Sequence, residues 1–119
     1  MALAAATVAA GRTPTPRLID GRETAVSGER EPIPAGVVDS LRPMMRLVVT
    51  NGTAEDLQGA GDVRGKTGEA EFAGGSHSWF TGYRGDMAFS ALIVGGGSSE
   101  YAVRMLKWML DELPPGYLA

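Results

Sequence analysis

The stretch at residues 63–71, in the middle of the chain, places the tightest constraint on what this sequence can form. It holds Lys66 between Gly65 and Gly68, and the chain has only one other lysine, Lys107. A solubilising surface lysine needs no glycine neighbours. Glycines, which lack a Cβ, are needed where another backbone or a ligand must approach closely. The stretch is therefore predicted to form an extended edge against which a ligand can lie.

Composition excludes several classes of function. A chain of 119 residues has room for one domain. Its net charge of -3, without a cluster of Lys and Arg, gives no field for holding nucleic acid, so nucleic acid is not expected as a partner. Without cysteine, the single histidine His77 cannot assemble a metal site, and no cofactor is expected. No apolar run approaches the roughly 20 residues that a membrane-spanning helix needs.

The first 36 residues are predicted to form a helix and an irregular connection. Residues 1–11 are rich in alanine, the best helix former, and close with Gly11, a usual residue after a helix end. Because this helix has no polar face, it should be covered on all sides, so we expect the chain to be a piece of a larger domain. Residues 17–19 are expected to form a short strand before a turn at residues 20–21, and residues 22–36 a surface loop.

A second helix is predicted to start with Asp39 or Ser40 as its cap, which places Pro43 in the tolerant first turn. Its apolar residues recur at helical spacing, namely Leu41, Met44, Met45, Val48 and Val49. The helix should end at residues 51–52. Residues 53–62 show no periodicity and lead into the lysine stretch.

Three strands and a helix are predicted in the second half. The strand that holds Lys66 is followed by a loop at residues 72–76 and a strand at 77–83. Residues 84–86 make a turn, and residues 87–94 form a mostly buried strand. Together these strands are expected to form an antiparallel sheet with Lys66 on its first strand.

The last helix is predicted to begin with Ser98 as a cap and to cover one face of that sheet. Its expected apolar face comprises Ala102, Met105, Leu106, Met109, Leu110 and Leu113. Trp108 lies outside this face and is expected to be partly exposed. The predicted fold class is therefore α+β, an antiparallel sheet packed by a C-terminal helix and accompanied by further helices.

Three patterns have ordinary explanations. Residues 60–67 resemble a loosened phosphate-binding loop, but no buried strand precedes them and no helix start follows. Residues 84–86 form an Arg-Gly-Asp triplet, yet a Gly-Asp pair between two strands is ordinary hairpin chemistry. His77 lies beside glycine-rich residues and has no nucleophile or carboxylate partner at a recognisable spacing, so a structural or exposed role is expected.

The triplet Lys66-Thr67-Gly68 supports a more specific interpretation. In the penicilloyl serine transferases such a triplet lies on the edge strand of the central antiparallel sheet. Here it is followed by a glycine-rich loop, a hairpin, an apolar strand, three glycines and a helix. That order, with the upstream segments at residues 1–11, 13–19 and 48–54, resembles the C-terminal portion of the transpeptidase domain of class B penicillin-binding proteins. The resemblance extends over nearly the whole chain.

The resemblance implies a role for each residue of the motif. Lys66 would supply positive charge to a cleft and assist proton transfer at a serine hydroxyl. Thr67 would bind the carboxylate of a peptide C-terminus or of a β-lactam. Gly68 would leave room for a substrate backbone along the strand. The backbone N–H of Glu69 would be one of two oxyanion donors.

The sequence departs from the family pattern in two ways. The family more often has Thr where this chain has Glu69. If the Glu69 side chain points into the cleft, it should weaken anion binding, and Glu69→Thr should then raise the rate of acylation by β-lactams. The chain also contains no Ser-x-x-Lys and no Ser-x-Asn. The nucleophile and its base are therefore expected from an N-terminal portion of the enzyme.

Residues 1–119 are accordingly expected to be the C-terminal portion of a serine D,D-transpeptidase that cross-links peptidoglycan stem peptides and is acylated by β-lactam antibiotics. The resemblance implies that the whole enzyme lies on the outer face of the cytoplasmic membrane and takes part in a division or elongation complex. Two alternatives remain open. One is a portion of a D,D-carboxypeptidase or β-lactamase, and the other is a non-catalytic peptide-binding module of the same fold.

Overall fold

The chain folds into a three-stranded sheet flanked by helices, with an irregular segment at residues 11–34. The computed structural model describes residues 1–117, and its elements in order are α1 (Ala2–Ala10), α2 (Ala35–Asn51), the 3-10 helix η1 (Glu55–Ala60), β1 (Arg64–Phe72), β2 (Gly75–Arg84), β3 (Met87–Ile93) and α3 (Glu100–Asp111). The strands are antiparallel in the order β1-β2-β3. The predicted α+β class is confirmed, and Lys66 lies on an edge strand.

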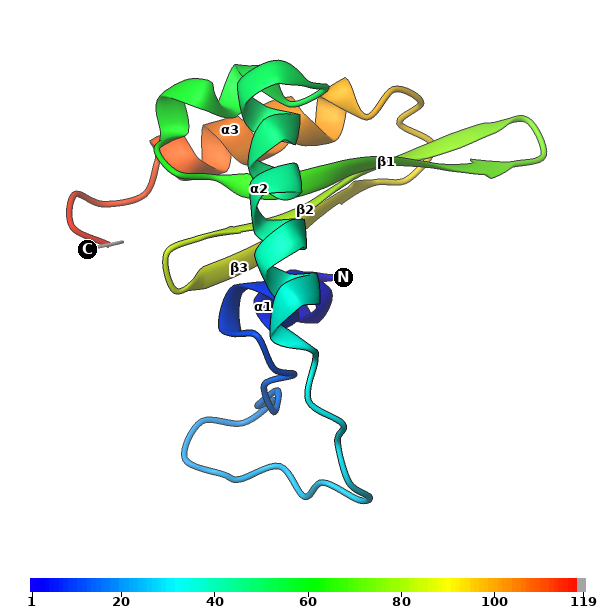
Figure 1. Ribbon diagram of the computed structural model, residues 1–119. Coiled ribbons are helices and arrows are strands. Elements are labelled where there is room, and N and C mark those ends of the chain that lie inside the picture. The colour runs from blue at the N-terminus through cyan, green and yellow to red at the C-terminus, as the bar shows by residue number, and fades with distance from the viewer. Residues whose placement is uncertain (118–119) are drawn as a thin grey trace.

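The two faces of the sheet have different neighbours. In Figure 1, α3 and η1 lie above the sheet, α1 lies below it, and α2 crosses the β1 side. The main core fills the space between the sheet, α3 and η1, and it includes Phe80 from β2. On the other face, the Thr81 hydroxyl donates to the carbonyl of Met1, next to α1. Because neighbouring strand residues point to opposite faces, Phe80 and Thr81 mark the two sides.

Helix α1 forms as predicted and ends at Gly11, whose φ of 69° is the left-handed conformation that glycine adopts readily. Only Ala5 of this helix is fully buried by the described residues. The prediction of a strand at residues 17–19 is wrong. Leu18 is 95% exposed and the segment has no strand to pair with, so no ladder of hydrogen bonds stabilises it.

Helix α2 starts earlier than predicted, at Ala35, so Pro43 lies inside the helix and not in its first turn. Burial of Val38 accounts for the early start, because packing outweighs the weak helix propensity of the residues around it. Pro43 has no N–H to donate to the carbonyl of Asp39. Asp39 is exposed, so water can satisfy that carbonyl.

The β1–β2 hairpin is tighter than the predicted loop at residues 72–76. Phe72 pairs with Gly75, which leaves only Ala73 and Gly74 in the turn. Gly74 has a φ of 100°, a conformation that side chains rarely adopt, so the glycine permits the short turn. The predicted turn between β2 and β3 is confirmed, and its Gly85 has a φ of 54°.

Helix α3 packs on the sheet through a face that differs in part from the predicted one. Its buried residues are Ala102, Val103, Leu106 and Leu110, with Leu113 packed beside them. Met105 and Met109, predicted to be buried, are 38% and 39% exposed. The helix has apolar residues on two adjoining stripes, and the sheet contacts the stripe that includes Val103. Trp108 is exposed, as predicted.

The start of α3 is anchored on the sheet by acceptors from two strands. The Ser78 hydroxyl on β2 accepts the N–H of Ala102 at 3.0 Å, and the Glu69 carboxylate on β1 accepts the N–H of Ser99 at 2.9 Å. The N-cap residue is Ser99 and not Ser98 as predicted, although the Ser98 hydroxyl accepts the Glu100 N–H at 3.4 Å. These acceptors satisfy N–H groups that the first turn of a helix leaves unpaired.

Replacing Ser78 with alanine should lower the free energy of unfolding by about 1–3 kcal/mol, because the Ala102 N–H would stay buried without a partner. Denaturant unfolding of the two proteins measures the difference. Ser90→Ala is the matched control, since Ser90 is exposed and donates to the carbonyl of Phe80 on the same sheet. Equal losses for the two variants would contradict a special role of the buried hydroxyl.

Candidate functional site

Lys66 lies on the edge strand β1, and its positive charge forms no ion pair within residues 1–117. Lys66 is exposed, and its Nζ donates a hydrogen bond to the carbonyl of Thr67 at 2.8 Å. Lys66 lies opposite Thr81 in the register, so it projects from the face that α1 flanks. None of the ion pairs formed among residues 1–117 involves Lys66. Its ammonium group is therefore available to an anionic ligand.

The two glycines beside Lys66 serve different purposes. A Cβ at Gly65 would lie 2.6 Å from both Cε1 of Phe80 and the carbonyl oxygen of Thr81. Gly65 is therefore required by its close packing against the Phe80 ring and the backbone of β2, and not by a ligand. A Cβ at Gly68 would meet nothing closer than Cβ of Trp79, at 3.5 Å. Only Gly68 leaves space along the strand.

Thr67 faces the opposite side of the strand from Lys66 and is only 7% exposed. It pairs with Phe80 in the register, and its Oγ1 lies 2.6 Å from Oγ1 of Thr53. Thr53, in the turn after α2, was not among the residues singled out from the sequence. Gly52, which follows the last residue of α2, indicates a turn at this point of the sequence. It does not indicate which strand the turn contacts.

The Glu69 carboxylate contacts the start of α3. Its Oε1 accepts the N–H of Ser99 at 2.9 Å. Glu69 also lines the open cavity described below, so faster acylation of Glu69→Thr stays a prediction. The carboxylate next to the motif stabilises the positive end of a helix.

Glu69→Gln should lower the free energy of unfolding by about 1 kcal/mol, because the charge at the α3 N-terminus is lost. Thermal or denaturant unfolding measures the change. Glu71→Gln is the matched control, since Glu71 is an exposed carboxylate on the same strand and forms no ion pair within residues 1–117. If both variants unfold at the same denaturant concentration as the unsubstituted chain, the capping role is wrong.

An open cavity of about 280 Å³ lies beside the Lys-Thr-Gly triplet. Its lining residues are Met1, Gly68, Glu69, Ala70 and Trp79. Gly68 and Ala70 alternate with Thr67 and Glu69 along β1, so they share the Lys66 side of the strand. The cavity therefore has a mostly apolar lining that includes Gly68 and Ala70, on the face of β1 from which Lys66 projects.

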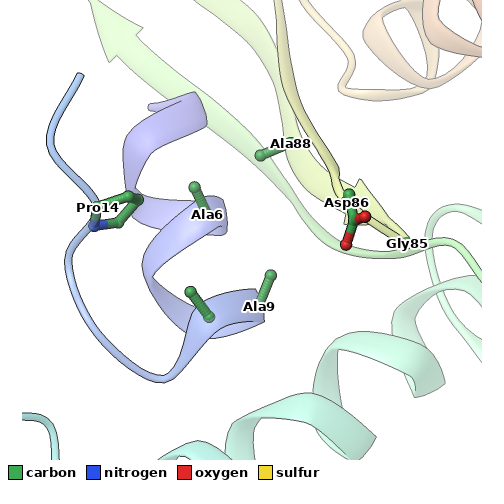
Figure 2. A pocket seen from close by; sticks show the side chains of 7 residues that line it. Ala6, Ala9, Pro14, Gly85, Asp86 and Ala88 are labelled. Atoms are coloured by element: carbon green, nitrogen blue, oxygen red, sulfur yellow. The ribbon is translucent and has the colours of Figure 1, made fainter. Parts of the chain in front are cut away.

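A second cavity, of about 250 Å³, lies between α1 and the β2–β3 turn (Figure 2). Most of its lining is alanine, with Pro14 and Gly85, and Asp86 supplies its one ionisable side chain. Such a lining offers little to orient a ligand. The Arg-Gly-Asp triplet is thus a hairpin turn, as the sequence indicates.

Arginines hold the beginning of β1 in place. Arg46 on α2 donates to the carbonyls of Gly61 and Val63, at 3.1 and 2.8 Å. Asp62 forms ion pairs with both Arg46 and Arg64. The hydrogen bonds that Arg64 donates to the Asp62 carboxylate raise the pKa of the guanidinium above its ordinary value. These hydrogen bonds and ion pairs hold the backbone of residues 61–64, which leads into the Lys-Thr-Gly triplet.

His77 has a structural role, as expected. Its Nδ1 accepts the N–H of Gly95 at 2.9 Å, and its ring stacks on Phe72 with centroids 4.6 Å apart. The phosphate-loop interpretation remains excluded, because Lys66 and Thr67 lie within a strand and not at a helix start.

The described part of the chain has neither a cluster of metal ligands nor a helix that could span a membrane. Among residues 1–117, no group of three or more His, Cys, Asp or Glu side chains is arranged to hold a metal ion. Over the same residues, none of the helices combines the length and the apolar character needed to cross a bilayer.

Comparison with known proteins identifies the family. No curated protein and no solved structure matches the chain. The family model described as the penicillin binding protein transpeptidase domain matches residues 1–106. Because that match includes all three strands and most of α3, the chain belongs to the penicillin binding protein transpeptidase domain family.

Proposed function

We propose that this chain supplies the Lys-Thr-Gly strand of a class B serine D,D-transpeptidase, which cross-links peptidoglycan stem peptides through a serine acyl-enzyme and is acylated by β-lactams. Family membership supports a transpeptidase in general. The observation that carries the finer proposal is Lys66, which is exposed on an edge strand and forms no ion pair among residues 1–117, two residues before Gly68, which lines an open cavity. An extended peptide recognised by its carboxylate needs such a strand and such a charge.

Each residue of the motif has one task in this proposal. The Lys66 ammonium gives the cleft positive charge and assists proton transfer at a serine hydroxyl. Thr67 donates to the carboxylate of the peptide or of the β-lactam. Gly68 leaves room for the peptide backbone, and the Glu69 backbone N–H is one of two oxyanion donors. A donor of that kind contributes about 3 kcal/mol to transition-state stabilisation.

The serine nucleophile and its base come from an N-terminal portion of the enzyme in this proposal, because the chain itself has no Ser-x-x-Lys and no Ser-x-Asn. We place the whole enzyme on the outer face of the cytoplasmic membrane, where stem peptides are cross-linked, in a division or elongation complex. Residues 1–119 are then its C-terminal portion.

Labelled penicillin tests the proposal. The chain is incubated with it alone and together with the portion that carries Ser-x-x-Lys, and adducts are detected by denaturing electrophoresis and intact mass. We expect a stable covalent adduct on the serine-bearing portion only when both are present. An adduct that is hydrolysed within the assay indicates the carboxypeptidase or β-lactamase alternative. Retention of penicillin without a covalent bond indicates a binding module.

A further inference from the structure

A hydroxyl from outside the motif contacts the Lys-Thr-Gly strand. Oγ1 of Thr53 and Oγ1 of Thr67 lie 2.6 Å apart, within the range of an O–H···O hydrogen bond. Thr67 is nearly buried, whereas Thr53 is exposed. The Thr67 hydroxyl is therefore oriented by a side chain that lies 14 residues earlier in the chain.

The turn that carries Thr53 is fixed on both sides. A Cβ at Gly52 would lie 2.9 Å from the carbonyl oxygen of Val48, so the backbone there requires glycine. Ala54 is fully buried, and its N–H donates to the same Val48 carbonyl at 3.0 Å. The backbone on either side of Thr53 is thus held by contacts that do not involve its hydroxyl.

The direction of the hydrogen bond decides what Thr67 can do. A hydroxyl has one proton to donate and can accept as well. If Thr67 donates to Thr53, its proton is not available to a ligand. If Thr53 donates to Thr67, the Thr67 proton is free to point at a carboxylate. Because a carboxylate only accepts, its binding selects the second arrangement, and each bond in the chain polarises the next.

We propose that Thr53 is a positioning residue for carboxylate recognition: its hydroxyl donates to Thr67, which in turn donates to the free carboxylate of a peptide C-terminus or of a penicillin. The inference rests on the proposed function of Thr67. It adds a residue outside the Lys-Thr-Gly motif to the binding of this ligand class, and it gives the turn between α2 and η1 a role in substrate selection.

The test measures the second-order rate constant for acylation of the intact enzyme by benzylpenicillin. Thr53→Val, which keeps the shape and removes the hydroxyl, should lower this constant about tenfold. Thr53→Ala should act in the same direction, and Thr53→Ser, which restores the hydroxyl, should stay within about twofold of the unsubstituted enzyme. Thr50→Val is the matched control, because Thr50 is an exposed threonine on α2 whose hydroxyl donates only to the Arg46 carbonyl.

A double-mutant cycle separates positioning from a structural effect. In a Thr67→Val background, Thr53→Val should cause no further loss of the acylation rate, since the two residues act in series. An equal loss in both backgrounds, or a Thr53→Val enzyme that is acylated at the unsubstituted rate, would overturn the inference. Failure of the unsubstituted enzyme to be acylated by benzylpenicillin is a different result, which rejects the proposed function itself.

Discussion

Lys66→Ala should lower the second-order rate constant for acylation by benzylpenicillin about a hundredfold or more in the intact enzyme. The ammonium of Lys66 is exposed, and no carboxylate among residues 1–117 neutralises it. In the function proposed above, its removal takes away both the charge that attracts a ligand carboxylate and the group that assists proton transfer at the serine. Stopped-flow acylation with a reporter β-lactam measures the rate constant.

The second lysine of the chain provides the control. Lys107 lies on α3 and pairs with Asp111, so Lys107→Ala removes the same charge far from the motif and should leave acylation unchanged. Lys66→Arg keeps the charge but replaces a compact ammonium with a planar guanidinium, and it should recover only part of the rate. Acylation of Lys66→Ala within twofold of the unsubstituted enzyme would reject the role proposed for this lysine.

The strands of the sheet are predictable from the sequence because short runs of neighbouring residues specify each strand and each turn. The glycine and aspartate between β2 and β3 specify a turn, and the apolar run after them specifies a buried strand. Gly11 likewise marks the end of α1. Such turn and helix-end residues act through the local backbone conformation, so the predictions based on them do not depend on which part of the chain packs against the strand or helix.

The errors arise where packing decides between local options. Helix α3 has enough apolar residues to bury either of two stripes, and only the sheet determines that Val103 is buried and Met105 exposed. The start of α2 shows the same effect, since burial of Val38 extends the helix beyond the cap that the sequence indicates. Periodicity gives the period of a helix but not the choice between adjoining faces.

The sequence indicates the residues of the candidate site but not the contacts that surround them. The Lys66 triplet is visible as a motif, whereas the bond between Thr53 and Thr67 and the contact of Glu69 with Ser99 join segments that are far apart in sequence. No spacing rule connects such segments. The two glycines beside Lys66 look alike in the sequence, and only the position of the Phe80 ring distinguishes them.

Gly65→Ala should destabilise the chain by about 3 kcal/mol, at the upper end of what overpacking a core costs. The added Cβ would lie 2.6 Å from both Cε1 of Phe80 and the Thr81 carbonyl oxygen. Phe80 is fully buried and the carbonyl belongs to the paired strand, so neither can move away without disturbing the core. Denaturant unfolding should show a lower midpoint, or no folded baseline at all.

Gly68→Ala is the matched substitution on the same strand, and it separates folding from ligand binding. The nearest atom to its Cβ would be Cβ of Trp79 at 3.5 Å, an ordinary contact, so the unfolding midpoint should change little. The added methyl group would nevertheless occupy the cavity that Gly68 lines and slow acylation. If Gly65→Ala folds as stably as Gly68→Ala, the packing requirement at residue 65 is wrong. If Gly68→Ala folds and is acylated at the full rate, the peptide does not lie along this part of β1.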